Sequence, residues 1–126
     1  MHHGYMQRPK SLWAPLLIAL ICRSAAAHHS AAIFDTHTSL LLSGTVREFQ
    51  FTNPHCFIQL LVPGANGSVE WSVEMGGPTH LLRHGWTPRL LRPGDAITVR
   101  VYPLKDGSRG ASFVSATRAD GRPLGS

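Results

Sequence analysis

The sequence predicts a small, mainly β domain, a five-stranded OB-like Greek-key barrel with one short helix between its third and fourth strands. Three observations support this fold class. Five short segments rich in strand-forming residues follow one another over about 80 residues, turn residues separate them, and one short helical segment lies between the third and fourth. A small β-sandwich would use similar strands, but the lone helix at that place favours the barrel.

The first strand is expected over residues 40–51, which are rich in β-forming side chains. Gly44 lies within this strand and suits a bulge or a sharp bend. Pro54 restricts Asn53 to extended conformations, and neither residue suits a central strand. The strand should therefore end before a turn at Thr52-Asn53-Pro54.

The second and third strands are recognised by alternation of apolar and polar residues. Residues 56–62 alternate so that one face is apolar, a loop of turn-forming residues follows over 63–67, and residues 69–75 alternate most clearly. The expected inner face of the second strand carries Cys56, Ile58, Leu60 and Val62.

The helix and the last two strands complete the domain, which we expect over residues 39–126. Pro78 suits the first position of a short helix, and Gly85 is a natural stop. A further turn should begin at Thr87-Pro88. Strands are then expected over 97–102, with the odd-numbered residues inward, and over 111–117.

Residues 1–27 have the pattern of a secretory signal peptide. Arg8 and Lys10 form a basic flank, residues 11–22 are mostly apolar, and Ala25-Ala26-Ala27 supplies a small-residue cleavage site. The apolar run is shorter than the roughly 20 residues that span a bilayer. There is no twin-arginine pair, so we expect the general secretory route, a periplasmic or secreted product, and no stable membrane anchor after cleavage.

Cleavage after Ala27 would change the charge and the cysteine count. Nine basic side chains would remain against seven acidic ones, so the net charge falls from +5 to +2. This small charge and export argue against a nucleic-acid partner. Cys56 would be the only cysteine, which excludes an internal disulfide, and residues 28–38 would form an N-terminal tail. Met6 is an alternative start, and the cleavage position is open.

Several short motifs connect the sequence to a known group of proteins. These motifs are Ala27-His28-His29-Ser30, Phe34-Asp35, Gly44-Thr45-Val46, Phe51-Thr52-Asn53-Pro54-His55, and Trp86-Thr87 followed by Pro93-Gly94-Asp95. In them the chain resembles an uncharacterised family of small exported bacterial proteins, classed as a domain of unknown function. The resemblance runs from Ala27 to about Leu124 and implies a periplasmic, single-domain, OB-like barrel without an established activity. Phe51 departs from the family, which more often has Trp there.

The histidines are the outlying feature of the composition, since eight of them exceed the seven acids. If the mature chain begins at His28, that residue offers an α-amine and an imidazole, which can chelate one Cu(II) ion. His29 and the T-N-P-H residue His55 could complete a copper, or less readily a zinc, site. The alternative is that His28 and His29 belong to a solvated, poorly ordered tail.

His55 directly follows the turn and should lie at the barrel surface or rim. Together with Phe51, Asn53 and Phe57 it is a candidate binding surface. The structural alternative is that Asn53 caps the turn while His55 hydrogen-bonds a neighbouring carbonyl.

Other chemistry-bearing residues support weaker hypotheses. His80 and His84 are spaced i, i+4 on the helix and can meet on one face, but Arg83 opposes a cation there, which favours an exposed polar face. Glu70 and Glu74 share a strand face that is solvated by default. Cys56 is expected to be a buried hydrophobe rather than a nucleophile.

These observations favour an exported, non-enzymatic binding or interaction domain of unknown ligand. The alternative is a periplasmic copper- or zinc-binding protein that uses His28, His29 and His55. Catalytic residues are not predicted, and an enzyme would be indicated only by a pocket that joins His55 to Glu70 or Glu74. The partner and the oligomeric state are open.

Overall fold

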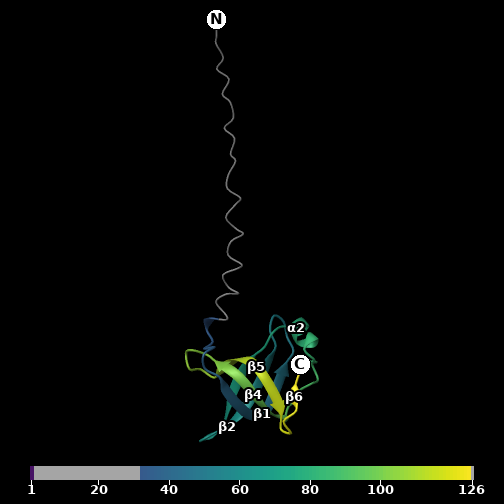
Figure 1. The fold of residues 1–126 in the computed structure, drawn as a ribbon. Helices are drawn as coiled ribbons and strands as arrows, with labels where there is room; N and C mark the ends of the chain where they lie inside the picture. Colours follow the sequence, from purple (N-terminus) through teal and green to yellow (C-terminus); the bar gives the residue numbers. More distant parts are fainter. Residues whose placement is uncertain (2–31, 126) are drawn as a thin grey trace.

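In the part of the chain that the structure describes, six strands and the short helix α2 follow one another (Figure 1). The computed structural model describes Met1 and residues 32–125, so the predicted signal peptide and the histidines at positions 28 and 29 lie outside the described residues. The elements are β1 (Leu40–Gln50), β2 (Phe57–Gly64), β3 (Gly67–Glu74), α2 (Pro78–Arg83), β4 (Ala96–Pro103), β5 (Gly110–Arg118) and β6 (Pro123–Leu124).

The strands form one sheet that closes on itself. The order is β3-β2-β1-β4-β5-β6, with antiparallel pairing between neighbours. A parallel pairing of β3 with β5, in which Val73 faces Ala111, closes β1 to β5 into a barrel. With α2 between β3 and β4, this is the predicted five-stranded OB-like barrel. The two-residue strand β6 was not expected and extends the edge of β5.

Gly44 allows β1 to pair with two neighbouring strands. The first half of β1 pairs with β4 and the second half with β2, and the exchange occurs at Thr45. A Cβ atom on Gly44 would overlap the backbone carbonyl of Leu61, so only glycine permits this close approach. The bulge or bend predicted at Gly44 is instead found farther along β1, where the register of the β1–β2 pair shifts between Val46 and Glu48.

The barrel interior is filled by aliphatic side chains. Ile97, Val99 and Val101 point inward with no more than 2% of their surface exposed, as the alternation of β4 predicted. Each such burial contributes about 1.5–3 kcal/mol relative to an exposed side chain. The rest of the core is Leu42, Val46, Cys56, Ile58, Leu60, Val73, Met75, Leu81, Trp86, Leu91, Ala111, Ala116 and Leu124.

The structure corrects one loop prediction and confirms another. The loop expected over residues 63–67 is shorter, because β2 continues to Gly64 and β3 begins at its ladder partner Gly67. The turn expected at Thr87-Pro88 is a single hydrogen-bonded turn, in which Leu90 N donates to Thr87 O at 3.0 Å. It does not grow into a helix, since residues 94 and 95 bond Val46 of β1 instead.

Part of the expected N-terminal tail is attached to the barrel. Lys105 N donates to Ile33 O at 2.9 Å, Asp35 N donates to Pro103 O at 2.8 Å, and Phe34 bridges to Leu104. These contacts extend the barrel wall beyond the end of β4. Within residues 32–125, no helix is both long and apolar enough to cross a membrane.

Candidate functional site

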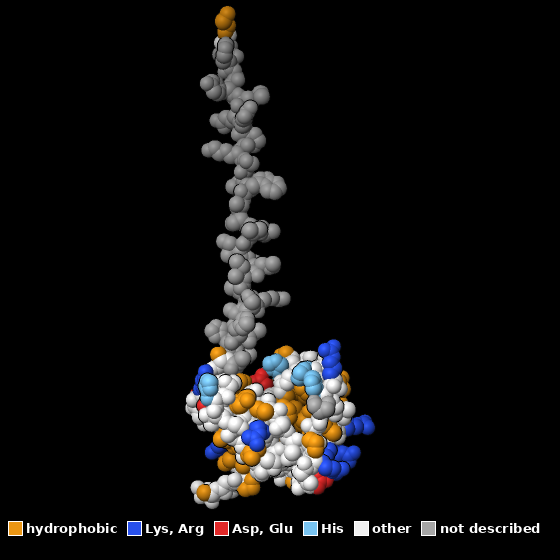
Figure 2. Space-filling view, viewed as in Figure 1, with side chains coloured by type: hydrophobic (Ala, Val, Ile, Leu, Met, Phe, Trp, Pro, Cys, Tyr) orange, Lys and Arg blue, Asp and Glu red, His pale blue; other side chains and the backbone are white. Residues whose placement is uncertain are grey.

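A pocket of about 710 Å³ opens at one end of the barrel, beside α2 and the C-terminal end of the chain. Ligand-binding pockets commonly have volumes of about 300–1,000 Å³ and a mostly apolar lining with a few polar groups. Figure 2 shows histidines and one acidic side chain around apolar surface on this side of the molecule. The lining residues are Phe34, His55, Glu74, Met75, Gly76, His80, Leu81, His84, Trp86, Ser112, Phe113, Val114, Ser115, Ala116, Pro123, Leu124 and Gly125.

The apolar wall is built on Trp86, which is only 3% exposed. Its ring meets Phe113 of β5 edge to face at a centroid distance of 5.3 Å and Phe49 of β1 at 5.9 Å. Gly125 crosses close to the Trp86 indole, and a Cβ atom there would overlap the ring nitrogen. Aromatic packing thus gives this end of the pocket a fixed shape.

Backbone hydrogen bonds of Cys56 join the T-N-P-H segment (residues 52–55) to the Gly76-Gly77 loop. Cys56 N donates to Gly76 O at 3.1 Å, and Met75 N donates to Cys56 O at 2.8 Å. A Cβ atom on Gly77 would lie 2.8 Å from the Pro54 carbonyl oxygen, so the two loops are in close contact. The motif therefore positions one rim of the pocket.

His55 is paired with Glu74 across that rim. Because a carboxylate can only accept, Nδ1–H of His55 donates to Glu74 Oε1, and in the neutral ring this leaves Nε2 as an acceptor. The His55 side chain is 42% exposed and that of Glu74 is 25% exposed. The alternative partner expected from sequence, a neighbouring carbonyl, is wrong, since the ladder contact between Met75 and Cys56 brings the two strand ends together. Within the turn itself, Thr52 Oγ1 donates to His55 O at 2.7 Å, and Cys56 Sγ donates to Thr52 O at 3.7 Å.

Glu70, the other acid of the same strand, has a different role. It accepts a hydrogen bond from Arg47 Nε, and both side chains are more than 40% exposed. Glu70 does not line the pocket. The pocket that would indicate an enzyme, one that joins His55 to Glu74, is thus present, whereas Glu70 belongs to a surface ion pair.

His80 and His84 line the same pocket, and their rings meet as their spacing predicted. The ring centroids are 4.4 Å apart with an interplanar angle of 39°. His84 Nδ1–H donates to His80 O at 2.9 Å. Within residues 32–125, no group of three or more His, Cys, Asp or Glu side chains converges to hold a metal ion.

The other predicted site residues that the structure describes lie outside the pocket. Phe51 packs against the core and meets Phe49 edge to face at 5.8 Å, Phe57 is half-buried, and Asn53 is exposed on the turn. Cys56 is fully buried, as expected, and burial raises the pKa of its thiol. His28 and His29 lie outside the described residues.

The residues that sequence reasoning missed are mainly those of the apolar wall. Trp86, Phe113 and Leu124 come from a loop, a strand and the C-terminal end, and only the barrel topology brings them together. A tryptophan directly after a helix-ending glycine was the one available signal.

A closed five-stranded barrel with a ligand-sized pocket at its end is the class that this geometry defines. The chain belongs to the Family of unknown function (DUF6152), which matches residues 16–113. This confirms the resemblance to an uncharacterised domain family. No curated protein matches the chain.

Parts of the chain are similar to solved structures. One is TiaS in complex with a tRNA and ATP, with 23% identity, a TM-score of 0.48, and coverage of 68% of this chain and 19% of TiaS. Another is the mitochondrial single-stranded DNA binding protein Rim1 of S. cerevisiae, with 9% identity, a TM-score of 0.48, and coverage of 65% and 94%. The chain spans only a fifth of TiaS, and neither likeness supports an argument about function.

Proposed function

We propose that this protein is an exported, non-enzymatic domain that binds a small, largely apolar molecule in the pocket at the end of the barrel. The observation that carries the proposal is the pocket itself, in which an aromatic and aliphatic wall faces the His55–Glu74 pair. Such a lining holds the apolar body of a ligand, while His55 Nε2 accepts a hydrogen bond from a ligand hydroxyl or N–H group.

Binding is favoured over catalysis because no nucleophile within residues 32–125 is hydrogen-bonded to His55. Among residues 32–125, neither a hydroxyl nor a thiol is hydrogen-bonded to its ring, and the Cys56 thiol donates to Thr52 O instead. Nucleophilic catalysis requires the nucleophile and its base within hydrogen-bond reach. The His55–Glu74 pair is therefore assigned to orientation of the ligand.

The test is a fluorescence titration with N-phenyl-1-naphthylamine, a neutral apolar probe with one N–H donor. Ser115 is exposed and lines the pocket, so Ser115→Trp places a large ring in its mouth. Ser68→Trp adds the same ring on an exposed position of β3 outside the pocket and is the matched control. We expect saturable binding by the wild type and Ser68→Trp, and at least tenfold weaker binding by Ser115→Trp. Equal affinities in all three proteins would contradict the proposal.

Export is the second part of this proposal, and it is supported by the charged, apolar and small-residue pattern of residues 1–27. Mass spectrometry of the protein recovered from the periplasmic fraction should give a chain that begins at His28. Recovery from the cytoplasm with Met1 or Met6 intact would refute export but would leave the pocket proposal standing.

A second candidate function is copper binding by His28, His29 and His55. The structure favours it at one point, because Glu74 accepts from His55 Nδ1 and so leaves Nε2 for a metal. Metal-bound imidazoles are commonly oriented in this way. Phe34 lines the same pocket as His55, and the five residues back to position 29 can span about 17 Å.

Copper binding is tested by titration of Cu(II) into the chain that begins at His28. Adding one residue before His28 removes its free α-amine and should weaken binding at least tenfold, and His55→Ala should do the same. The matched control His37→Ala removes an exposed histidine outside the pocket. An affinity that neither change alters rules out this site.

A further inference from the structure

We propose that His80 and His84 form a separate site for one transition-metal ion at the mouth of the pocket, with Cu(II) preferred over Zn(II). The site uses only described residues and does not depend on where the mature chain begins. It also goes beyond the proposed function, because the ion is a ligand in addition to the apolar molecule.

The spacing of the two rings fits ligation of a single ion. With metal–nitrogen bonds of about 2.0 Å and ring centres about 1.1 Å farther out, two imidazoles at about 90° have centres about 4.4 Å apart. A tetrahedral angle of about 109° would require about 5.1 Å. The observed centroid distance of 4.4 Å matches the right-angled arrangement. Square-planar or tetragonal geometry is typical of Cu(II), whereas zinc is usually tetrahedral.

Local hydrogen bonding prepares His84 for this role. Its Nδ1–H donates to the His80 carbonyl, so the ring is held in the tautomer whose Nε2 carries a lone pair. A backbone carbonyl on the second ring nitrogen is a common feature of metal-bound histidines. Among residues 32–125, the His80 ring makes no hydrogen bond, so its nitrogens are available to a ligand.

The backbone around the pair keeps the rings close. His80 lies in α2, and His84 follows its last residue at the C-cap. The His80 ring packs against Gly76, where a Cβ atom would come within 2.8 Å of its Cδ2. The absence of a side chain at Gly76 therefore leaves the space that this ring occupies.

The charges around the pocket favour a cation. Glu74 is the only acidic residue in the pocket lining among residues 32–125, and neither lysine nor arginine is part of that lining. Arg83, which was expected to oppose a cation, is exposed and outside this lining. Two protein ligands leave the remaining coordination positions to water, so we expect weaker binding than at a three-histidine site.

The experiment uses the full mature chain, without an affinity tag, with His28→Ala and His29→Ala to remove the two N-terminal imidazoles. Cu(II) is titrated by calorimetry, and the equimolar complex is measured by electron paramagnetic resonance. We expect one site whose hyperfine pattern shows two imidazole nitrogens. His80→Ala and His84→Ala should each weaken binding at least tenfold.

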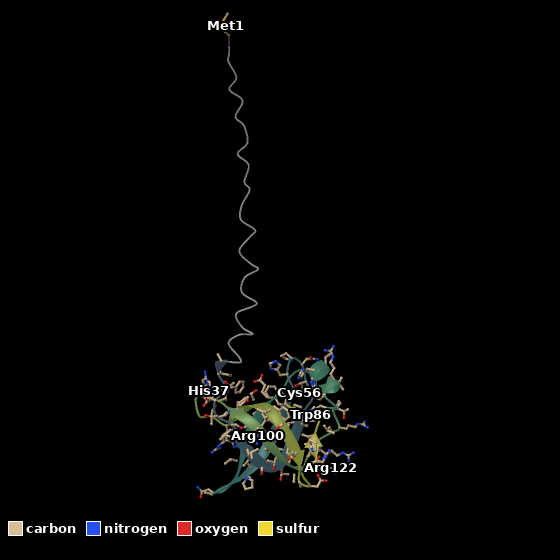
Figure 3. All side chains as sticks on the ribbon, in the orientation of Figure 1. Met1, His37, Cys56, Trp86, Arg100 and Arg122 are labelled. Atoms are coloured by element: carbon tan, nitrogen blue, oxygen red, sulfur yellow. The ribbon has the colours of Figure 1, made fainter. Side chains whose placement is uncertain are left out.

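Two controls make the result specific. His37→Ala removes an exposed histidine outside the pocket lining, labelled at the left of the domain in Figure 3, and should change the affinity less than twofold. His55→Ala should also leave it unchanged, which separates this site from the second candidate function. Thermal melts confirm that the variants fold. The proposal is overturned if His80→Ala or His84→Ala binds Cu(II) as tightly as His37→Ala, or if His55→Ala alone abolishes binding.

Discussion

Substitution of Gly77 by alanine should separate the T-N-P-H segment from the loop that follows β3. The new Cβ atom would lie 2.8 Å from the Pro54 carbonyl oxygen, whereas ordinary contacts begin at 3.4 Å. One of the two backbones must therefore move by about 0.6 Å. Gly77 has φ −72° and ψ 166°, which alanine adopts freely, so the effect is steric and not conformational.

The magnitude follows from the hydrogen bonds between these segments. A shift of this size would stretch the bond from Cys56 N to Gly76 O beyond hydrogen-bond range, since it is already 3.1 Å long. Loss of a buried backbone hydrogen bond lowers the stability by about 1–3 kcal/mol. Alanine also reduces the conformational freedom of the unfolded chain, which stabilises the folded state by about 0.4–1 kcal/mol. We expect a net loss of about 1–2 kcal/mol in the free energy of unfolding.

Urea denaturation measures the stability, and amide hydrogen exchange measures the local effect. Val46 in β1 is the comparison site, because its amide donates to Asp95 O at 2.8 Å and not to either of these two segments. Amide exchange at Cys56 and Met75 should accelerate more than amide exchange at Val46. A Gly77→Ala variant as stable as the wild type, with an unchanged Cys56 amide, would refute the close contact described here.

Three further predictions concern the barrel and its surface. Gly125→Ala should lower stability by about 1–3 kcal/mol in a thermal melt, because Gly125 has φ 75° and its Cβ would overlap Trp86; an unchanged melting temperature would contradict this. Cys56 should react with a thiol reagent only after unfolding, since burial both blocks access and raises its pKa, which reduces the thiolate at neutral pH; fast labelling of the native protein would be inconsistent with this burial. Arg47→Ala should change the free energy of unfolding in urea by no more than about 1 kcal/mol, because the ion pair of Arg47 with Glu70 is exposed. A larger loss would require a contact that the structure lacks within residues 32–125.

Alternation along the strands predicted the barrel because burial of one strand face is a local property of the sequence. Ile97, Val99 and Val101 are inward for this reason. Gly44 marks a close approach to Leu61, whereas the register shift itself lies between Val46 and Glu48. The extra strand β6 has only two residues, too few for any periodicity to reveal it.

The candidate site was predictable only in part. The i, i+4 spacing placed His80 against His84, since this relation lies within one helical turn. The partner of His55 could not be chosen, because Glu70 and Glu74 share a strand face and only the loop contacts bring Glu74 to the rim. The apolar wall depends on which strand ends the closed barrel brings together, and this is a property of the topology.

The most direct test of the central claim, that the end pocket is the binding site, is an amide-resolved NMR titration of the mature protein with N-phenyl-1-naphthylamine. We expect saturable shifts concentrated at Leu81, Ser115 and Leu124, which line the pocket, with little change at exposed Leu41 on β1. Shifts centred on Leu41 and its neighbours, or no saturable shifts at the pocket residues, would contradict it.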